Sequence, residues 1–131
     1  MMKKNLRKKA IASAKKAYAP YSHYYVGCAL LTQKGEIFSG CNVENSSYGG
    51  TICAERVAIT KAVSEGFKKF KEIYIYTHNG VGPCGLCLQM MSEFFDQETV
   101  IILGNKKGQG KIYSLAQLLP LAFTPDQLTL E

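Results

Sequence analysis

Tryptophan, internal repeats, low-complexity tracts and linker-like segments are all absent from this chain of 131 residues. No apolar run approaches the ~20 residues that a membrane-spanning helix needs. The basic N-terminus is not followed by the apolar stretch of a signal peptide. These absences argue against repeat, membrane and secreted proteins. A chain of this length forms one core, so we expect a single domain over residues 1–131, located in the cytoplasm.

Acidic residues are fewer than basic ones: the 10 Asp and Glu face 16 Lys and Arg, which gives a net charge of +6. The excess is concentrated in the first segment with helical spacing, at Lys3, Lys4, Arg7, Lys8, Lys9, Lys15 and Lys16. Such a cluster can contact nucleic acid. More often a charge run is the solvated face of a helix. We therefore expect a solvent-facing helix surface, with neither nucleic acid nor a membrane as partner.

The chain has 5 cysteines, an odd number without a secretion signal, which favours thiols or metal ligands over disulfides. Cys28 and Cys41 lie in strand-like segments and are expected to be small buried hydrophobic residues. The other cysteines occur in two short motifs, Cys53-Ala54-Glu55-Arg56 and Pro83-Cys84-Gly85-Leu86-Cys87. Catalytic zinc takes three protein ligands and leaves its fourth position for water. Three cysteines with a nearby glutamate therefore predict a hydrolytic metal site.

Hydrophobic periodicity predicts alternating helices and strands. The expected helices are 5–19, which Pro20 ends, then 53–65, 84–95 and 114–119, and the expected strands are 25–32, 36–41, 72–77, 99–103 and 111–113. A polar, glycine-containing loop at 42–51 is about as long as functional loops tend to be. Thr124, Pro125 and Gln127 form the capping pattern of a last short helix. This order predicts an α/β fold, a sheet of about five strands with helices on its faces.

The predicted elements place the three cysteines at helix starts. Cys84 and Cys87 are three residues apart, so both thiols face the same side of one helix, and Cys53 begins another. Helix N-termini favour thiolate over thiol. Zinc with three thiolates carries a negative charge, which Arg56 would offset as a neighbour of the sulfurs. The alternative for Arg56 is an ordinary surface position on a helix.

Two other uses of the cysteines stay open at this point. A structural zinc needs a fourth protein ligand, and His23 or His78 could supply it. A Cys-x-x-Cys pair can also be a thioredoxin-like redox motif, although the chain lacks the tryptophan context of that motif. A basic binding module stabilised by a structural zinc would predict no functional effect of Glu55→Gln.

The two cysteine motifs resemble those of the cytidine deaminases, in the small tetrameric form that uses three cysteines. The resemblance covers nearly the whole chain and extends to Ala19-Pro20-Tyr21-Ser22, Val26-Gly27-Cys28-Ala29-Leu30, Gly40-Cys41-Asn42-Val43-Glu44-Asn45 and Leu118-Leu119-Pro120-Leu121-Ala122-Phe123. It implies an α/β/α sandwich with a mixed sheet, one Zn²⁺ per chain and a homotetramer with shared active sites. The implied reaction is hydrolytic deamination of cytidine and 2′-deoxycytidine, as in pyrimidine salvage. The alternative substrate is an aminated base, another nucleoside analogue or RNA-borne cytidine.

The resemblance also implies roles for individual residues. Cys53, Cys84 and Cys87 would hold the zinc. Glu55 would take a proton from the activated water, pass it to N3 of cytosine and later help to protonate the departing ammonia. The implied substrate-binding residues are Asn42 and Glu44 for the ribose, Tyr24 beside the nucleoside, the backbone of Ala54 at the base edge, and Tyr48 and Phe123 in the pocket shared between subunits.

Two positions depart from the family pattern. Family members commonly have Arg directly after the last cysteine, whereas this chain has Leu88, which leaves Arg56 as the cation expected near the site. Tyr24 stands where Phe is usual, and its added hydroxyl needs a hydrogen-bond partner or water. Neither change affects the metal ligands or Glu55.

Overall fold

The computed structural model describes residues 2–128. The elements along the chain are α1 (Met2–Ala14), β1 (Gly27–Thr32), β2 (Ile37–Cys41), the 3-10 turn η1 (Tyr48–Gly50), α2 (Ala54–Ser64), β3 (Phe70–Tyr76), α3 (Gly85–Phe94), β4 (Val100–Gly104), β5 (Gly110–Tyr113), α4 (Leu115–Leu118) and the 3-10 turn η2 (Pro125–Leu128). Within this range, none of the helices has the length and apolar character to cross a membrane.

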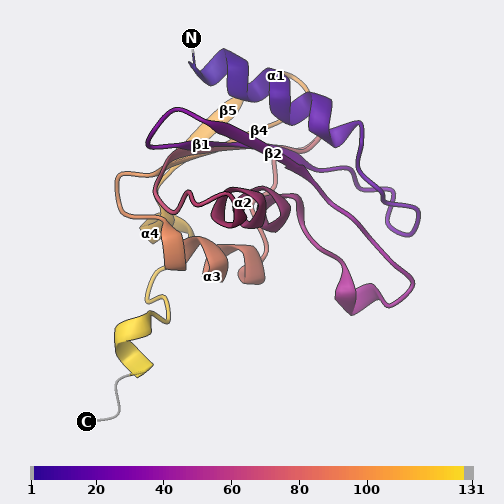
Figure 1. The fold of residues 1–131 in the computed structure, drawn as a ribbon. Coiled ribbons are helices and arrows are strands. Elements are labelled where there is room, and N and C mark those ends of the chain that lie inside the picture. Colours follow the sequence, from indigo (N-terminus) through magenta and orange to yellow (C-terminus); the bar gives the residue numbers. More distant parts are fainter. Residues whose placement is uncertain (1, 129–131) are drawn as a thin grey trace.

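The strands form one sheet of five in the order β2-β1-β3-β4-β5. β3 and β4 are parallel, and the other neighbouring strands are antiparallel. Helix α1 covers one face of the sheet, and α2 and α3 cover the other (Figure 1). The predicted α/β/α sandwich with a mixed sheet of about five strands is therefore confirmed.

Most of the core lies between the sheet and helices α2 and α3. Gly40 on β2 lets α2 approach the sheet closely, because a side chain at this position would collide with the carbonyl oxygen of Ala54 and the backbone of Ala58. Cys28 on β1 is fully buried, and its thiol donates to the same Ala54 carbonyl at 3.2 Å. The first turn of α2 is thus fixed against the sheet, and this turn carries Glu55.

Helix α1 packs through Leu6, Ala10 and Ala14, which recur every four residues and are buried. The prediction that this helix continues to Ala19 was wrong, because it ends at Ala14. Beyond that point the backbone of Tyr18 pairs with the loop after β2: its N–H donates to the carbonyl of Asn42 at 3.0 Å. Pairing with this loop takes the chain out of the helix well before Pro20.

The first helix also begins earlier than predicted, at Met2 rather than at Asn5. The remaining predicted boundaries hold to within about two residues. The first strand begins at Gly27 rather than at Tyr25, because the N–H of Val26 donates to the side chain of Asn42 instead of to a strand. Cys41 is half-buried, so the prediction that it is a buried hydrophobic residue was wrong, whereas the prediction for Cys28 was right. The side chain of Gln127 lies outside the described part of the chain.

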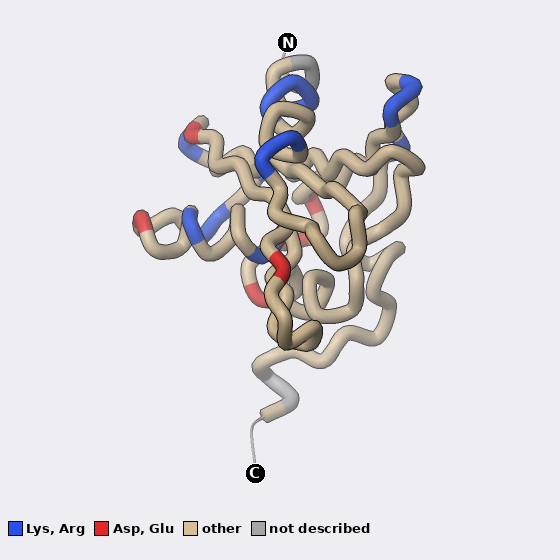
Figure 2. The backbone as a smooth tube through the Cα atoms, turned by 90° about the vertical axis from the view of Figure 1, so that its right-hand side faces the viewer, with Lys and Arg blue, Asp and Glu red and all other residues tan. Residues whose placement is uncertain are grey.

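The basic N-terminal cluster is largely a solvent-facing surface. Its exposed members are Lys8, Lys9, Lys15 and Lys16. Figure 2 shows the basic residues of α1 in blue along that helix. Arg7 differs, because it donates to the Tyr74 hydroxyl at 2.7 Å and to the carbonyl of Asn105 at 3.1 Å. The side chains of Lys3 and Lys4 are outside the described residues. The cluster therefore matches the predicted solvated helix face, apart from Arg7, which ties α1 to the sheet.

Candidate functional site

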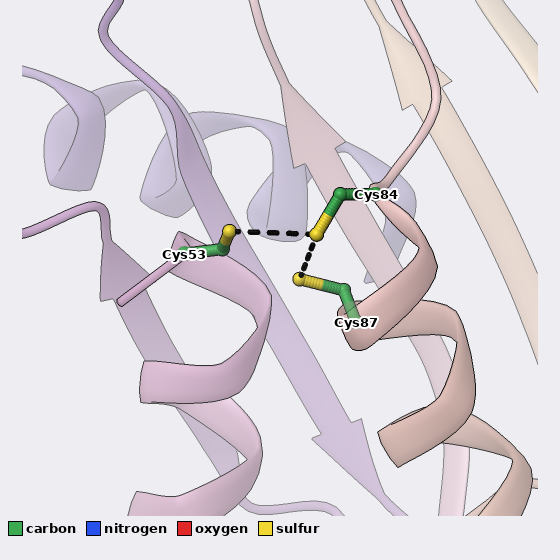
Figure 3. A group of neighbouring side chains, drawn as sticks. All are labelled: Cys53, Cys84 and Cys87. Carbon is green, nitrogen blue, oxygen red and sulfur yellow. Dashed lines mark hydrogen bonds between the residues drawn. The ribbon is translucent and has the colours of Figure 1, made fainter. Parts of the chain in front are cut away.

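The three cysteines of the two motifs meet where α2 and α3 begin (Figure 3). Cys53 is the N-cap of α2 and Cys84 the N-cap of α3, and neither side chain makes a capping hydrogen bond to the backbone of its helix. Cys87 lies one turn into α3. The Sγ atoms of Cys53 and Cys84 are 3.7 Å apart, and those of Cys84 and Cys87 are 3.4 Å apart. Two helix starts thus aim three sulfurs at one point, as the sequence predicts.

This sulfur cluster fits a tetrahedral zinc ion. Zn–S bonds of about 2.3 Å at tetrahedral angles put ligand sulfurs about 3.8 Å apart, close to the separations observed here. Among the described residues, the group of possible ligands within 4.8 Å of one another consists of the three cysteines. His23 and His78 line a different cavity. The structure therefore does not place a histidine at the cluster as the fourth ligand of a structural zinc.

The cysteines differ in acidity. Hydrogen bonds from Cys87 and Arg56 lower the pKa of Cys53 to about 5, despite partial burial. The same hydrogen bond to Cys53, together with burial, raises the pKa of Cys87. These opposite shifts make Cys53 the more acidic of the two cysteines. Metal binding would release protons, because zinc ligands bind as thiolates.

Arg56 supplies the positive charge beside the sulfurs. One terminal nitrogen of its guanidinium donates to the carbonyl of Thr51 at 3.0 Å and lies 3.8 Å from the Sγ of Cys53. The hydrogen bond to Cys53 raises the pKa of Arg56. Its Nε is buried without a partner. These contacts agree with the predicted neighbour of the sulfurs rather than with a free surface residue.

Glu55 lies in the first turn of α2, two residues after Cys53. Its side chain is 4% exposed. Burial raises the pKa of Glu55 to about 7, and the charge on Cys53 adds to this effect. A carboxyl group with a pKa near neutrality can both accept and donate a proton.

A cavity of about 250 Å³ opens beside the cysteines. Its lining includes Cys53, Cys84 and Glu55, together with the polar side chains of Asn42 and Glu44. Ala54 and Tyr24 also line it. The cavity thus brings together two of the three candidate metal ligands, the candidate proton carrier and four of the predicted substrate-binding residues. It is near the lower limit of ~300 Å³ for typical small-molecule sites.

Asn42 is buried and hydrogen-bonds to the loop that precedes β1. Its Oδ1 accepts from the N–H of Val26 at 3.0 Å, and its Nδ2 donates to the carbonyl of Tyr24 at 2.7 Å. The remaining N–H and lone pair of the amide are available to a ligand. Asn42 therefore shapes the cavity wall in addition to any contact with substrate.

Glu44 is also buried, and the loop before β1 surrounds its carboxylate with donors. The N–H groups of Tyr21 and Ser22 donate to its Oε1 at 3.0 and 3.1 Å, and the Ser22 hydroxyl donates to its Oε2. The hydrogen bond from the Ser22 hydroxyl is the main reason why the pKa of Glu44 is lowered. Ser22 belongs to a motif noted in the sequence, but its contact with Glu44 was not predicted. The two residues are 22 positions apart, and such a separation gives no sign of a contact.

The hydroxyl of Tyr24, which was expected to need a hydrogen-bond partner or water, has a partner in the structure. It donates to Oδ1 of Asn79 at 2.8 Å. Asn79, like Thr77 in the cavity wall, had not been singled out from the sequence. Thr77 and Asn79 come just after β3. Polar residues at the end of a buried strand were the one pattern in the sequence that could have indicated them as candidate site residues.

Three of the highlighted residues lie away from the cavity. Tyr48 is 72% exposed and Phe123 is 53% exposed, and neither belongs to the cavity lining of its own chain. Leu88 is buried and packs in the core beside α2 and α3. The family's usual cation after the last cysteine is thus replaced by a core side chain.

Comparisons with known proteins agree with this geometry. The family model described as the cytidine and deoxycytidylate deaminase zinc-binding region matches residues 2–103. A cytidine deaminase from Sporosarcina psychrophila is 45% identical over 127 residues, which cover 92% of this chain and 93% of that protein. One from Halalkalibacterium halodurans is 42% identical over 130 residues, 98% of each chain. The crystal structure of cytidine deaminase from Burkholderia pseudomallei has a TM-score of 0.89 at 42% identity, covering 94% of this chain and 100% of that chain. The chain therefore belongs to the cytidine and deoxycytidylate deaminase family.

Proposed function

We propose that this protein is a zinc-dependent hydrolase that converts cytidine and 2′-deoxycytidine to uridine and 2′-deoxyuridine, as an enzyme of pyrimidine salvage. The observation that carries the proposal is one cavity lined by two cysteines of the cluster, the buried Glu55 and the buried polar side chains of Asn42, Glu44 and Thr77. The five cysteines are free thiols, which suits the reducing conditions of the cytoplasm.

Zinc would be held by Cys53, Cys84 and Cys87, and when bound it would supply Lewis acidity for the attack of water on the base. Arg56 would offset the negative charge of the thiolates and hold Cys53 in place. The remaining chemistry is assigned to groups of the chain itself.

Glu55 is the proposed proton carrier. The overall reaction replaces the exocyclic amine at C4 of the base with an oxygen from water and releases ammonia. Glu55 would accept a proton from the attacking water and deliver it to N3, which makes C4 more electrophilic. It would then accept the proton of the hydroxyl group added at C4 and deliver it to the departing amine, which leaves as ammonia. Its place in the first turn of α2, fixed against the sheet, keeps the carboxyl group in one position for these transfers.

Asn42 and Glu44 are the proposed ribose-binding residues, with Tyr24 beside the nucleoside and the backbone of Ala54 at the base edge. Their shared place in the cavity lining supports this assignment. Buried polar groups left unpaired disfavour a substrate that lacks the sugar, so free cytosine should be a poor substrate.

We also propose a homotetramer in which Tyr48 and Phe123 complete the cavities of neighbouring subunits. Their exposure, outside the cavity of their own chain, supports this role. A cavity enclosed by neighbouring subunits would exclude a polymer, so cytidine within RNA should not react.

Ultraviolet-monitored deamination at measured zinc content tests the proposal. The substrates are cytidine, 2′-deoxycytidine, free cytosine and a cytidine-containing oligoribonucleotide. We expect rapid conversion of both nucleosides and little or no conversion of the other two. Zinc-loaded protein that is inert on both nucleosides would contradict the proposal, and activity on the oligoribonucleotide alone would favour an RNA substrate.

A further inference from the structure

We propose that the Tyr24 hydroxyl is a positioning group that holds the β3–α3 loop (residues 77–84) in its place in the cavity wall and thereby increases the affinity for the nucleoside. The inference rests on the proposed function, which assigns the cavity to a nucleoside. It concerns the hydroxyl alone, because a phenylalanine at this position would keep the ring.

The backbone of Tyr24 is fixed on both sides. Its N–H donates to the Ser22 hydroxyl oxygen at 3.1 Å, and its carbonyl accepts from Nδ2 of Asn42 at 2.7 Å. Asn42 is itself buried next to β1. Because the backbone is fixed, the position of the Tyr24 side chain is restricted, and its hydroxyl can hold another segment in place.

The hydroxyl reaches the first turn of the β3–α3 loop. It donates to Oδ1 of Asn79 at 2.8 Å, and the Thr77 hydroxyl donates to the same oxygen at 3.3 Å. Thr77 is 2% exposed, and its Oγ1 also accepts from the N–H of Gly80 at 2.7 Å. Gly80 has a φ of +75°, which favours glycine. Asn79 is exposed, but Thr77 donates to the same oxygen, so Tyr24 bonds to a turn that is itself held by hydrogen bonds.

The same loop forms part of the cavity wall. Val81, Gly82 and Pro83 line the cavity, and the loop ends at Cys84, the N-cap of α3 and a candidate metal ligand. Movement of this loop would change both the width of the cavity and the surroundings of the base. Holding it in place before substrate arrives reduces the ordering cost of binding, so the hydroxyl should act on KM more than on kcat.

The chain offers a matched control for removal of this hydroxyl. Tyr25 is adjacent, exposed and outside the cavity lining, so Tyr25→Phe removes the same group without touching the Asn79 contact. In the zinc-loaded enzyme, Tyr24→Phe should raise KM for cytidine about two- to tenfold, the effect of one neutral hydrogen bond, with kcat and zinc content unchanged. Tyr25→Phe should leave all three unchanged.

Substitutions of Asn79 separate this bond from a general effect on stability. Asn79→Ala should raise KM as much as Tyr24→Phe, and the double variant should be no worse than either single one, because both remove the same interaction. Asn79→Asp keeps an acceptor oxygen and should retain the wild-type KM. Additive effects of Tyr24→Phe and Asn79→Ala would overturn the inference, as would loss of affinity in Asn79→Asp.

Hydrogen–deuterium exchange gives a readout that does not depend on activity. Amides of residues 78–82 should exchange faster in zinc-loaded Tyr24→Phe than in Tyr25→Phe. Equal exchange in the two variants, or an unchanged KM in Tyr24→Phe, overturns the inference. A wild type inert on cytidine would instead reject the proposed function, and the exchange comparison would still decide whether the hydroxyl holds the loop.

Discussion

The cysteine side of the cavity and the side formed by the loop before β1 are built in different ways. At the cysteine side, three sulfurs and a carboxyl group come from the starts of two helices that pack on the sheet. At the loop side, Asn42 and Glu44 hold the loop before β1 through bonds to its backbone. The first side positions groups that would act on the reacting atoms. The second side positions a wall of the cavity, so substitutions there should weaken substrate binding more than they slow the chemical step.

The largest effect is expected from breaking the cysteine side. Cys84→Ser replaces a thiolate with a poor zinc ligand, so zinc content and deaminase activity should both fall to background. Cys41→Ser is the matched control, because Cys41 lies outside the cluster, and it should keep wild-type zinc and activity. Zinc analysis and ultraviolet-monitored deamination provide the two measurements. Full activity of Cys84→Ser would remove the basis for a metal site here.

A smaller effect at the same side is expected from Arg56→Gln. Loss of the cation beside Cys53 should weaken zinc binding about 10- to 100-fold, measured by competition with a chelator. Arg56→Lys keeps the charge and should lose less. An increase in KM at unchanged zinc affinity would show that Arg56 acts on substrate binding. It would contradict the assignment of Arg56 to the cysteine side of the cavity.

At the loop side, Glu44→Gln should lower kcat/KM for cytidine about 10- to 100-fold, as expected for a hydrogen bond to a charged group. Zinc content should not change. The low residual activity on free cytosine, which lacks the sugar, should not fall further. Glu65→Gln on the exposed end of α2 is the control for loss of one negative charge. An equal loss on cytidine and free cytosine would show that Glu44 does not bind the ribose.

The smallest effect concerns pH. The Ser22 hydroxyl lowers the pKa of Glu44, so the ionised carboxylate stabilises the fold above the unfolded pKa of about 4.3, and this contribution is lost as pH falls through the lower folded pKa. Ser22→Ala should reduce it. The difference in unfolding free energy between wild type and Ser22→Ala should therefore be present at neutral pH and shrink in acid. Zinc loss in acid affects both proteins alike, and a difference independent of pH would contradict this account.

The two sides also differed in how well the sequence predicted them. The cysteine cluster was predictable because Cys84 and Cys87 lie at helical spacing and Cys53 begins a second helix, so local rules place all three sulfurs. The order of strands and helices was equally predictable from hydrophobic periodicity, and the α/β/α sandwich is consistent with that order. The contacts of the loop side are long-range: Ser22 with Glu44, Tyr24 with Asn79, and the pairing of Tyr18 that ends α1 early. Spacing along the chain does not reveal such contacts, although Asn42 and Glu44 were found through their motif.

The most direct test of the central claim is the deaminase activity of Glu55→Gln at equal, measured zinc content. If the buried carboxyl group carries the protons of the reaction, kcat for cytidine should fall by about 10⁴ or more while zinc stays at about one ion per chain. Gln is nearly isosteric with Glu, so the fold and the cysteine cluster should be retained. A zinc-loaded Glu55→Gln variant with kcat within tenfold of the wild type would contradict the account.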